Sequence, residues 1–115
     1  MSKEFKTLSE FYPYYLTEHL DTTNRKLHFF GTSLVIFLGV MAILTQDYTY
    51  LIYVPLGGYG FAWIGHFFFE LNKPATFKYP LWSLISDFTM YYHIVTFQIE
   101  GKLDWACKRM DVKRK

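Results

Sequence analysis

The chain has 115 residues, of which 51% are hydrophobic and 22% aromatic, with a formal net charge of +2 and a single cysteine. This much apolar and aromatic surface excludes a disordered chain, and the length fits one domain, which we take as residues 1–115. The lone Cys107 excludes an internal disulfide framework. The small net charge gives no indication of nucleic-acid binding, so no nucleic-acid partner is expected.

The first predicted element is an amphipathic helix over about residues 8–20. Leu8, Phe11, Tyr15 and His19 recur there at helical spacing, and we expect this face to lie on a membrane surface. The ten residues at the start contain charged side chains and no apolar run, so no signal peptide is expected. The next apolar segment would then act as its own insertion signal.

Two uncharged stretches follow, at about residues 27–46 and 48–69, separated by Asp47. A helix needs about 20 mostly apolar residues to cross the hydrocarbon core of a bilayer, and both stretches are long enough. They predict a membrane helical hairpin in an all-α protein that forms a single integral membrane domain. Two buried helices of a soluble bundle remain the alternative.

A third, partly apolar helix is expected over about residues 79–99, with Asp87 as its one formal charge. It fits a re-entrant or interfacial helix that does not cross the membrane fully, with a full span as the alternative. No Lys or Arg lies near Asp47, whereas six lie in the basic tail, residues 101–115. A two-span hairpin therefore places both termini in the cytoplasm, with the tail solvated or on an anionic leaflet. The membrane would be the inner membrane in a bacterium or the endoplasmic reticulum in a eukaryote.

The hairpin register brings polar residues to one depth. His28 and His66 lie equally far from Asp47 along the chain, and Asn24 and Glu70 match one turn further out. Imidazole and carboxylate groups bind iron(II), zinc and manganese, and ionisable groups at membrane depth indicate a function. The pattern predicts a metal cluster at the cytoplasmic mouth of the hairpin. A histidine near a helix end that only makes a hydrogen bond is the alternative.

Other polar residues near that mouth have open roles. His19 is close enough in sequence to fold back over the cluster, whereas nothing fixes the depth of His93. Asp87 could be a ligand, the partner of a ligating histidine, or a solvated group. An i, i+4 pair such as His66 and Glu70 can present two ligands to one ion, or the carboxylate can orient the histidine.

The residues resemble a known family. The segments that carry the resemblance are FYPYYLTEHLDTTNRKLHFFGTSL, residues 11–34, and GYGFAWIGHFFFELNKPATFKYPLWSL, residues 58–84. They are similar to the small membrane family that includes the fungal 2-hydroxy fatty acid dioxygenase. The matching motif residues in this chain are His19, Asn24, Leu27-His28 with Gly31, Gly65-His66, Glu70 and Pro74-Ala75.

The resemblance implies an iron(II)-dependent dioxygenase that uses O2 to shorten a 2-hydroxy fatty acid, or a related lipid, by one carbon. It makes His19, His28 and His66 candidate iron ligands, with no catalytic residue expected beyond the metal site. Additional ligands, or groups that orient the ligands, are then expected among Glu70, Asn24, Asp87 and His93. Arg25, Lys73 and Lys78 are candidates for steering the substrate carboxylate, although each also fits a topology-setting charge.

Three alternatives remain open from the sequence. Zinc uses the same ligand set as iron(II). Two histidines at equal depth also fit axial ligation of a haem by His28 and His66. Finally, the hairpin could be a non-catalytic structural element or an oligomer interface. Because two spans bury little surface alone, a homo-oligomer or a packed third segment is expected in every case.

Overall fold

The computed structural model describes residues 5–114 and contains five α-helices joined by short 3-10 and π-helical segments, with no β-strand in that range. The elements are, in chain order, α1 (Leu8–Thr17), α2 (Thr22–Thr45), η1 (Tyr48–Tyr53), α3 (Val54–Ile64), η2 (Gly65–Glu70), η3 (Ala75–Phe77), α4 (Pro80–Val95) and α5 (Ile99–Met110). The all-α class predicted from the sequence is therefore confirmed.

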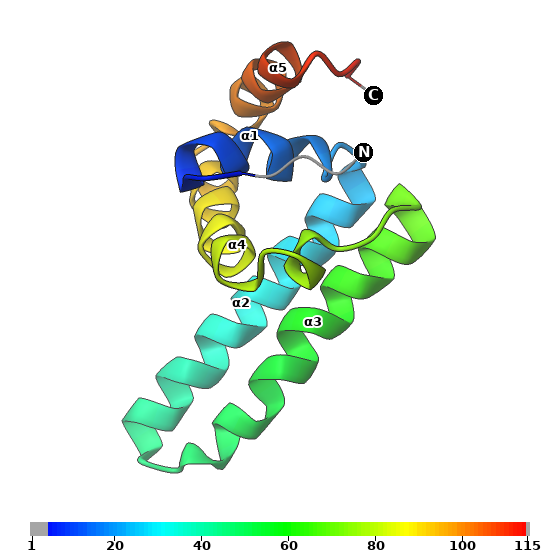
Figure 1. The fold of residues 1–115 in the computed structure, drawn as a ribbon. Helices are drawn as coiled ribbons and strands as arrows, with labels where there is room; N and C mark the ends of the chain where they lie inside the picture. The colour runs from blue at the N-terminus through cyan, green and yellow to red at the C-terminus, as the bar shows by residue number, and fades with distance from the viewer. Residues whose placement is uncertain (1–4, 115) are drawn as a thin grey trace.

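The molecule has two parts of different character (Figure 1). The helices α2 and α3 lie side by side and, with η1, form a projecting rod. The other helices α1, α4 and α5 pack together at one end of the rod, which we call the head. The buried core of the head includes Phe11, Leu16, Met90, Leu103 and Ala106. Most of the core therefore lies outside the rod.

Side-chain caps determine where the first two helices begin. The Thr7 hydroxyl accepts a hydrogen bond from the Glu10 amide at 3.2 Å, and the Asp21 carboxylate accepts one from the Asn24 amide at 3.0 Å. Each cap satisfies a backbone donor that lacks a partner within its helix. Because α1 ends at Thr17 and α2 starts at Thr22, His19 lies in the turn between them.

Glycines allow the two arms of the rod to approach closely. A Cβ atom at Gly31 would lie 3.0 Å from the Gly57 carbonyl oxygen, and one at Gly57 would lie 2.8 Å from Cδ2 of Leu34. A side chain at Gly31 would therefore force the two backbones apart by a few tenths of an ångström. The small residues thus bring α2 against α3 and set the spacing of the groups that they carry.

Within residues 5–114, α2 is the one helix long and apolar enough to cross a membrane by length and composition. Its most apolar window has a mean hydropathy of 2.2 and is only 28% buried. The second predicted span, residues 48–69, is instead divided into η1, α3 and η2, with Pro55 in the first turn of α3. Because no segment of this arm is a long α-helix, a hairpin of two membrane spans is not confirmed.

The chain after α4 differs from the sequence expectation. The predicted helix over residues 79–99 ends at Val95, before Phe97 takes a positive φ of 62°. The basic tail then forms α5, which packs against α1 and buries Leu103 and Ala106 completely. The charge count that predicted a solvated or leaflet-bound tail missed these apolar residues at helical spacing.

Candidate metal centre

Three histidines from separate parts of the chain converge where the rod meets the head. His19 comes from the turn before α2, His28 from the first half of α2, and His66 from η2. All three are buried, and each offers one ligand atom such that these atoms lie within 4.8 Å of one another. Buried imidazoles at this separation form a potential binding site for one metal ion.

The Nε2 atoms point into the cluster. Nε2 of His28 lies 3.2 Å from Nε2 of His66, which agrees with the equal depth inferred from their distances to Asp47. The ring of His19 lies edge-on to both, with centroids 4.4 and 4.5 Å away. Its own Nε2 is buried and has no hydrogen-bond partner. A buried polar atom without a partner is costly unless a ligand satisfies it.

Backbone and side-chain acceptors hold the outer nitrogens of two of these rings. Nδ1 of His19 donates to the Tyr15 carbonyl oxygen at 2.6 Å, and Nδ1 of His66 donates to Oδ1 of Asn72 at 2.7 Å. Nδ2 of Asn72 donates to the Glu18 carbonyl oxygen at 3.1 Å, which fixes the orientation of the amide. Because these oxygens accept, the hydrogen sits on Nδ1 and the lone pair on Nε2.

Asp87 lies beside the outer nitrogen of the third imidazole, that of His28. Its Oδ1 lies 3.5 Å from Nδ1 of His28 and also accepts a short hydrogen bond from the Tyr15 hydroxyl. Tyr15 in addition stacks on His19, with ring centroids 4.1 Å apart. One aromatic side chain therefore supports two of the three histidines.

This donor set fits a metal ion. Nε2 of His28 and Nε2 of His66 lie 3.2 Å apart, and the unpartnered Nε2 of His19 lies beside them, so one cation could bind all three nitrogens. The cavity at the cluster has a volume of about 20 Å³, which is room for about one water molecule or a small ion. Ligating histidines in proteins are usually oriented in this way through their second nitrogen.

Burial shifts the pKa values of His19 and Tyr15, which both lie outside the rod. Burial, together with the nearby His28 and His66, lowers the pKa of His19 well below its usual range, so its imidazole is neutral at neutral pH. Burial and the Asp87 carboxylate raise the pKa of Tyr15, so its hydroxyl keeps the proton that it donates. His19 is thus in the form that binds metals, and no proton has to be displaced from its Nε2.

Asn24 and Glu70 lie beside the cluster. Nδ2 of Asn24 donates to Oε1 of Glu70 at 3.4 Å, and the same carboxylate oxygen accepts from the Asp21 amide. The group of close ligand atoms found among the described residues consists of the three histidines, without Glu70. The sequence therefore placed this carboxylate near the site, and the structure shows it joining η2 to the start of α2.

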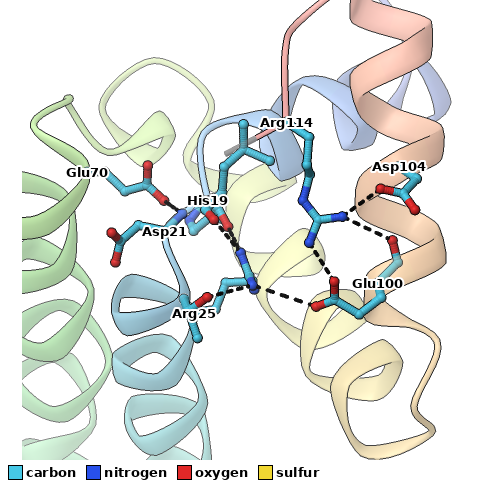
Figure 2. Close-up of polar contacts among 9 residues, drawn as sticks. His19, Asp21, Arg25, Glu70, Glu100, Asp104 and Arg114 are labelled. Carbon is cyan, nitrogen blue, oxygen red and sulfur yellow. Dashed lines mark hydrogen bonds and ion pairs between the residues drawn. The ribbon is translucent and has the colours of Figure 1, made fainter.

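The predicted steering residues lie in different surroundings. The Arg25 guanidinium is buried and donates to the carbonyl oxygens of His19 and Leu20 at 2.8 and 2.7 Å (Figure 2). It also lies 3.8 Å from Glu100 of α5, so it joins the His19 turn to the head. Lys73 and Lys78 are exposed in the chain between η2 and α4.

His93 lies outside the cluster. Its Nδ1 shares a hydrogen bond of 2.7 Å with the Tyr12 hydroxyl, which links α4 to α1. Of the predicted polar residues, the structure thus brings together His19, His28, His66 and Asp87, with Asn24 and Glu70 adjacent.

Sequence reasoning missed two supporting residues, Tyr15 and Asn72. Tyr15 stands four residues before His19, a spacing that predicts one shared helical face. The structure buries this face inside the protein, so the expectation that it lies on a membrane surface is wrong. Asn72 follows His66 by six residues, a spacing that predicts no contact between the two side chains. Its contact depends on the left-handed conformation of Leu71, which ends η2.

One comparison with known proteins found a match. A family model described as 2-hydroxy-palmitic acid dioxygenase Mpo1-like matches residues 5–99, which include all three histidines, Asn72 and Asp87. A search of the curated proteins found no match, and a search of the solved structures found none either. Because the matched region covers most of the chain, the protein belongs to the Mpo1-like family.

Proposed function

We propose that this protein is a membrane-embedded, iron(II)-dependent dioxygenase that shortens a 2-hydroxy fatty acid, or a related lipid, by one carbon. The observation that carries the proposal is the convergence of three buried imidazoles, each of which offers one ligand nitrogen within 4.8 Å of the other two. Membership of the Mpo1-like family adds the reaction class, because the family name describes a 2-hydroxy fatty acid dioxygenase.

The proposed reaction balances without an external reductant. One 2-hydroxy acid and one O2 give the acid one carbon shorter, CO2 and water. The bond between C1 and C2 breaks, C1 leaves as CO2, and C2 is oxidised to the new carboxyl carbon. One oxygen atom of O2 enters that carboxyl group and the other is reduced to water. No further redox partner is required.

The side chains of the protein would position the iron ion and keep its histidine ligands in the orientation that binds metal. His19, His28 and His66 would hold iron(II), which when bound supplies the activation of O2. The Tyr15 carbonyl, Asp87 and Asn72 keep the ring hydrogens on the outer nitrogens. Three protein ligands leave further positions of an iron ion open for other ligands. The residues around the cluster thus act by orienting the histidines.

The rod supports the membrane part of the proposal. Large apolar side chains near its tip are strongly exposed, namely Ile43, Leu44, Ile52 and Leu56. Soluble proteins rarely expose so large a contiguous apolar surface, whereas lipid would cover it. We place this rod in the bilayer, with both termini on the cytoplasmic side as the distribution of Lys and Arg indicates. The three histidines then lie at the cytoplasmic mouth.

Axial haem ligation is not favoured by the geometry. Between His28 and His66 there is a gap of 3.2 Å, and the cavity at the cluster is about 20 Å³. A macrocycle needs a pocket of several hundred Å³. In addition, the ring of His19 packs edge-on against both histidines, with centroids 4.4 and 4.5 Å away.

The test is product formation by the purified protein loaded with iron(II). We expect 2-hydroxyhexadecanoic acid to give pentadecanoic acid in an O2-dependent reaction, with label from isotopic O2 in the new carboxyl group. The His66→Ala variant should form no product, whereas His93→Ala should retain activity because His93 lies outside the cluster. Unchanged substrate despite bound iron would contradict the proposed reaction.

A further inference from the structure

An apolar groove begins at the metal centre and runs along the rod. It has a volume of about 250 Å³ and lies between α2, α3 and α4. One end is formed by His28 and Asp87, and these two residues also line the small cavity at the cluster. The groove and the metal centre therefore share a wall.

Away from that end the walls are apolar. Val35 lies on α2, Pro55 and Gly58 lie on α3, and Leu84 and Phe88 lie on α4. Leu84 and Phe88 are exposed, so the groove is open along part of its length. A groove with one polar end and apolar walls has the same polarity pattern as an amphiphile with a small polar head and a hydrocarbon tail.

We propose that this groove binds the hydrocarbon chain of the 2-hydroxy acid, with the hydroxyl and carboxylate at the histidine end, and that Gly58 determines how long a chain fits. The inference rests on the proposed function, because it takes the 2-hydroxy acid as the occupant. A bilayer phospholipid fits less well, since its large head group would have to lie against a cavity of about 20 Å³.

The position of Gly58 gives the groove a length scale. It precedes His66 by eight residues, which corresponds to about 12 Å along a helix axis. A fully extended chain advances about 1.2 Å per bond, so it reaches Gly58 after about ten carbons. An eight-carbon acid would therefore end before Gly58, whereas a sixteen-carbon acid would pass it.

The space beside Gly58 is limited. A Cβ atom at this position would lie 3.4 Å from Cγ2 of Val35, which is an ordinary contact. A methyl group therefore fits, but a larger side chain would extend into the groove. Gly60 offers a matched control on the same helix, because a Cβ atom there meets nothing within 4 Å.

The first test compares Gly58→Leu with Gly60→Leu in the full chain, reconstituted in nanodiscs, loaded with iron(II) and kept free of oxygen so that no turnover occurs. Affinities are measured for 2-hydroxyoctanoic and 2-hydroxyhexadecanoic acid. We expect Gly58→Leu to lower the ratio of long-chain to short-chain affinity at least about tenfold, since several methylenes lose their contacts. Gly60→Leu should leave the ratio unchanged. Equal ratios in both variants would overturn the proposal.

A second measurement needs no variant. A 2-hydroxyhexadecanoic acid with a photoreactive group at its tail end should label residues of α3 and α4 that line the groove, and unlabelled 2-hydroxyhexadecanoic acid should compete. Labelling at the outer face of the rod, or labelling that only phospholipid displaces, would overturn the proposal. Because both tests are done without turnover, their failure is distinguishable from failure of the dioxygenase reaction.

A milder variant extends the first test. Gly58→Ala adds a methyl group that fits the space, so it should lower the ratio of long-chain to short-chain affinity by less than Gly58→Leu does.

Discussion

The orientation of the three clustered imidazoles depends on neighbouring side chains, and sequence spacing does not single out all of them. Asn72 illustrates this dependence, because its amide accepts from Nδ1 of His66 and donates to the carbonyl of Glu18. We expect Asn72→Ala to lower metal affinity about 10–100-fold, as loss of such supporting groups does in other metal sites. Competition with a chelating dye would measure the change.

A matched comparison is the neighbouring Lys73→Ala, which alters an exposed side chain in the same loop. This variant should bind metal as the parent does. If the two variants bound metal equally well, the amide of Asn72 would have no orienting role.

Gly65 is the tightest glycine in the chain. A Cβ atom there would lie 1.8 Å from Oδ1 of Asn24, which clashes, and 3.2 Å from its Cα, which leaves the side chain little room to move away. Gly65→Ala should lower the free energy of unfolding by about 1–3 kcal/mol or more, the cost typical of overpacking. Thermal unfolding in detergent would show it.

The control for Gly65→Ala is Gly39→Ala, where an added Cβ meets nothing within 4 Å. Replacing a helical glycine by alanine in open space favours the helix by up to about 1 kcal/mol. A stabilised Gly39→Ala beside a destabilised Gly65→Ala would confirm the close contact between η2 and α2. Equal effects would argue against it.

Among the elements, α5 differs most from what its charges predict, because the basic tail forms a helix that packs against the head. Its Leu103 is completely buried against the head, so Leu103→Ala should cost about 2–5 kcal/mol of stability. Leu81→Ala makes the same change at an exposed position of α4 and should cost little. Comparable melting temperatures for the two variants would mean that α5 is a solvated tail after all.

The length of the apolar stretches and their symmetry about Asp47 predicted part of the fold and part of the histidine cluster. Hydrophobic length located α2 closely, and equal chain distance from Asp47 placed His28 opposite His66. The same length signal failed to show that the second arm is divided, because a proline and a π-helical turn change its pitch without adding charge. The role of Asn72 was not predicted because its position depends on the left-handed conformation of Leu71, which the sequence does not indicate.

At the level of the whole molecule, the division into rod and head predicts how the protein meets a membrane. Phe37 is exposed in the middle of α2, and an arginine at the centre of a spanning helix costs about 2.5–3.5 kcal/mol. Phe37→Arg should therefore reduce the fraction of protein that resists alkaline extraction from membranes.

Phe97 provides the comparison, because it is exposed between α4 and α5 in the head, away from the rod. Phe97→Arg should leave membrane retention unchanged. Equal release of both variants, or of neither, would contradict a rod that lies in the bilayer.

The most direct test of the central claim is the metal content of the purified protein, prepared without chelators or affinity-column metals, beside His66→Ala and His93→Ala. The three-histidine centre predicts near-stoichiometric iron in the parent and in His93→Ala, and loss of iron in His66→Ala, with no haem absorption. Stoichiometric zinc would retain the site but contradict oxygen chemistry. No metal in any sample, even after anaerobic reconstitution with iron(II), would contradict the metal centre itself.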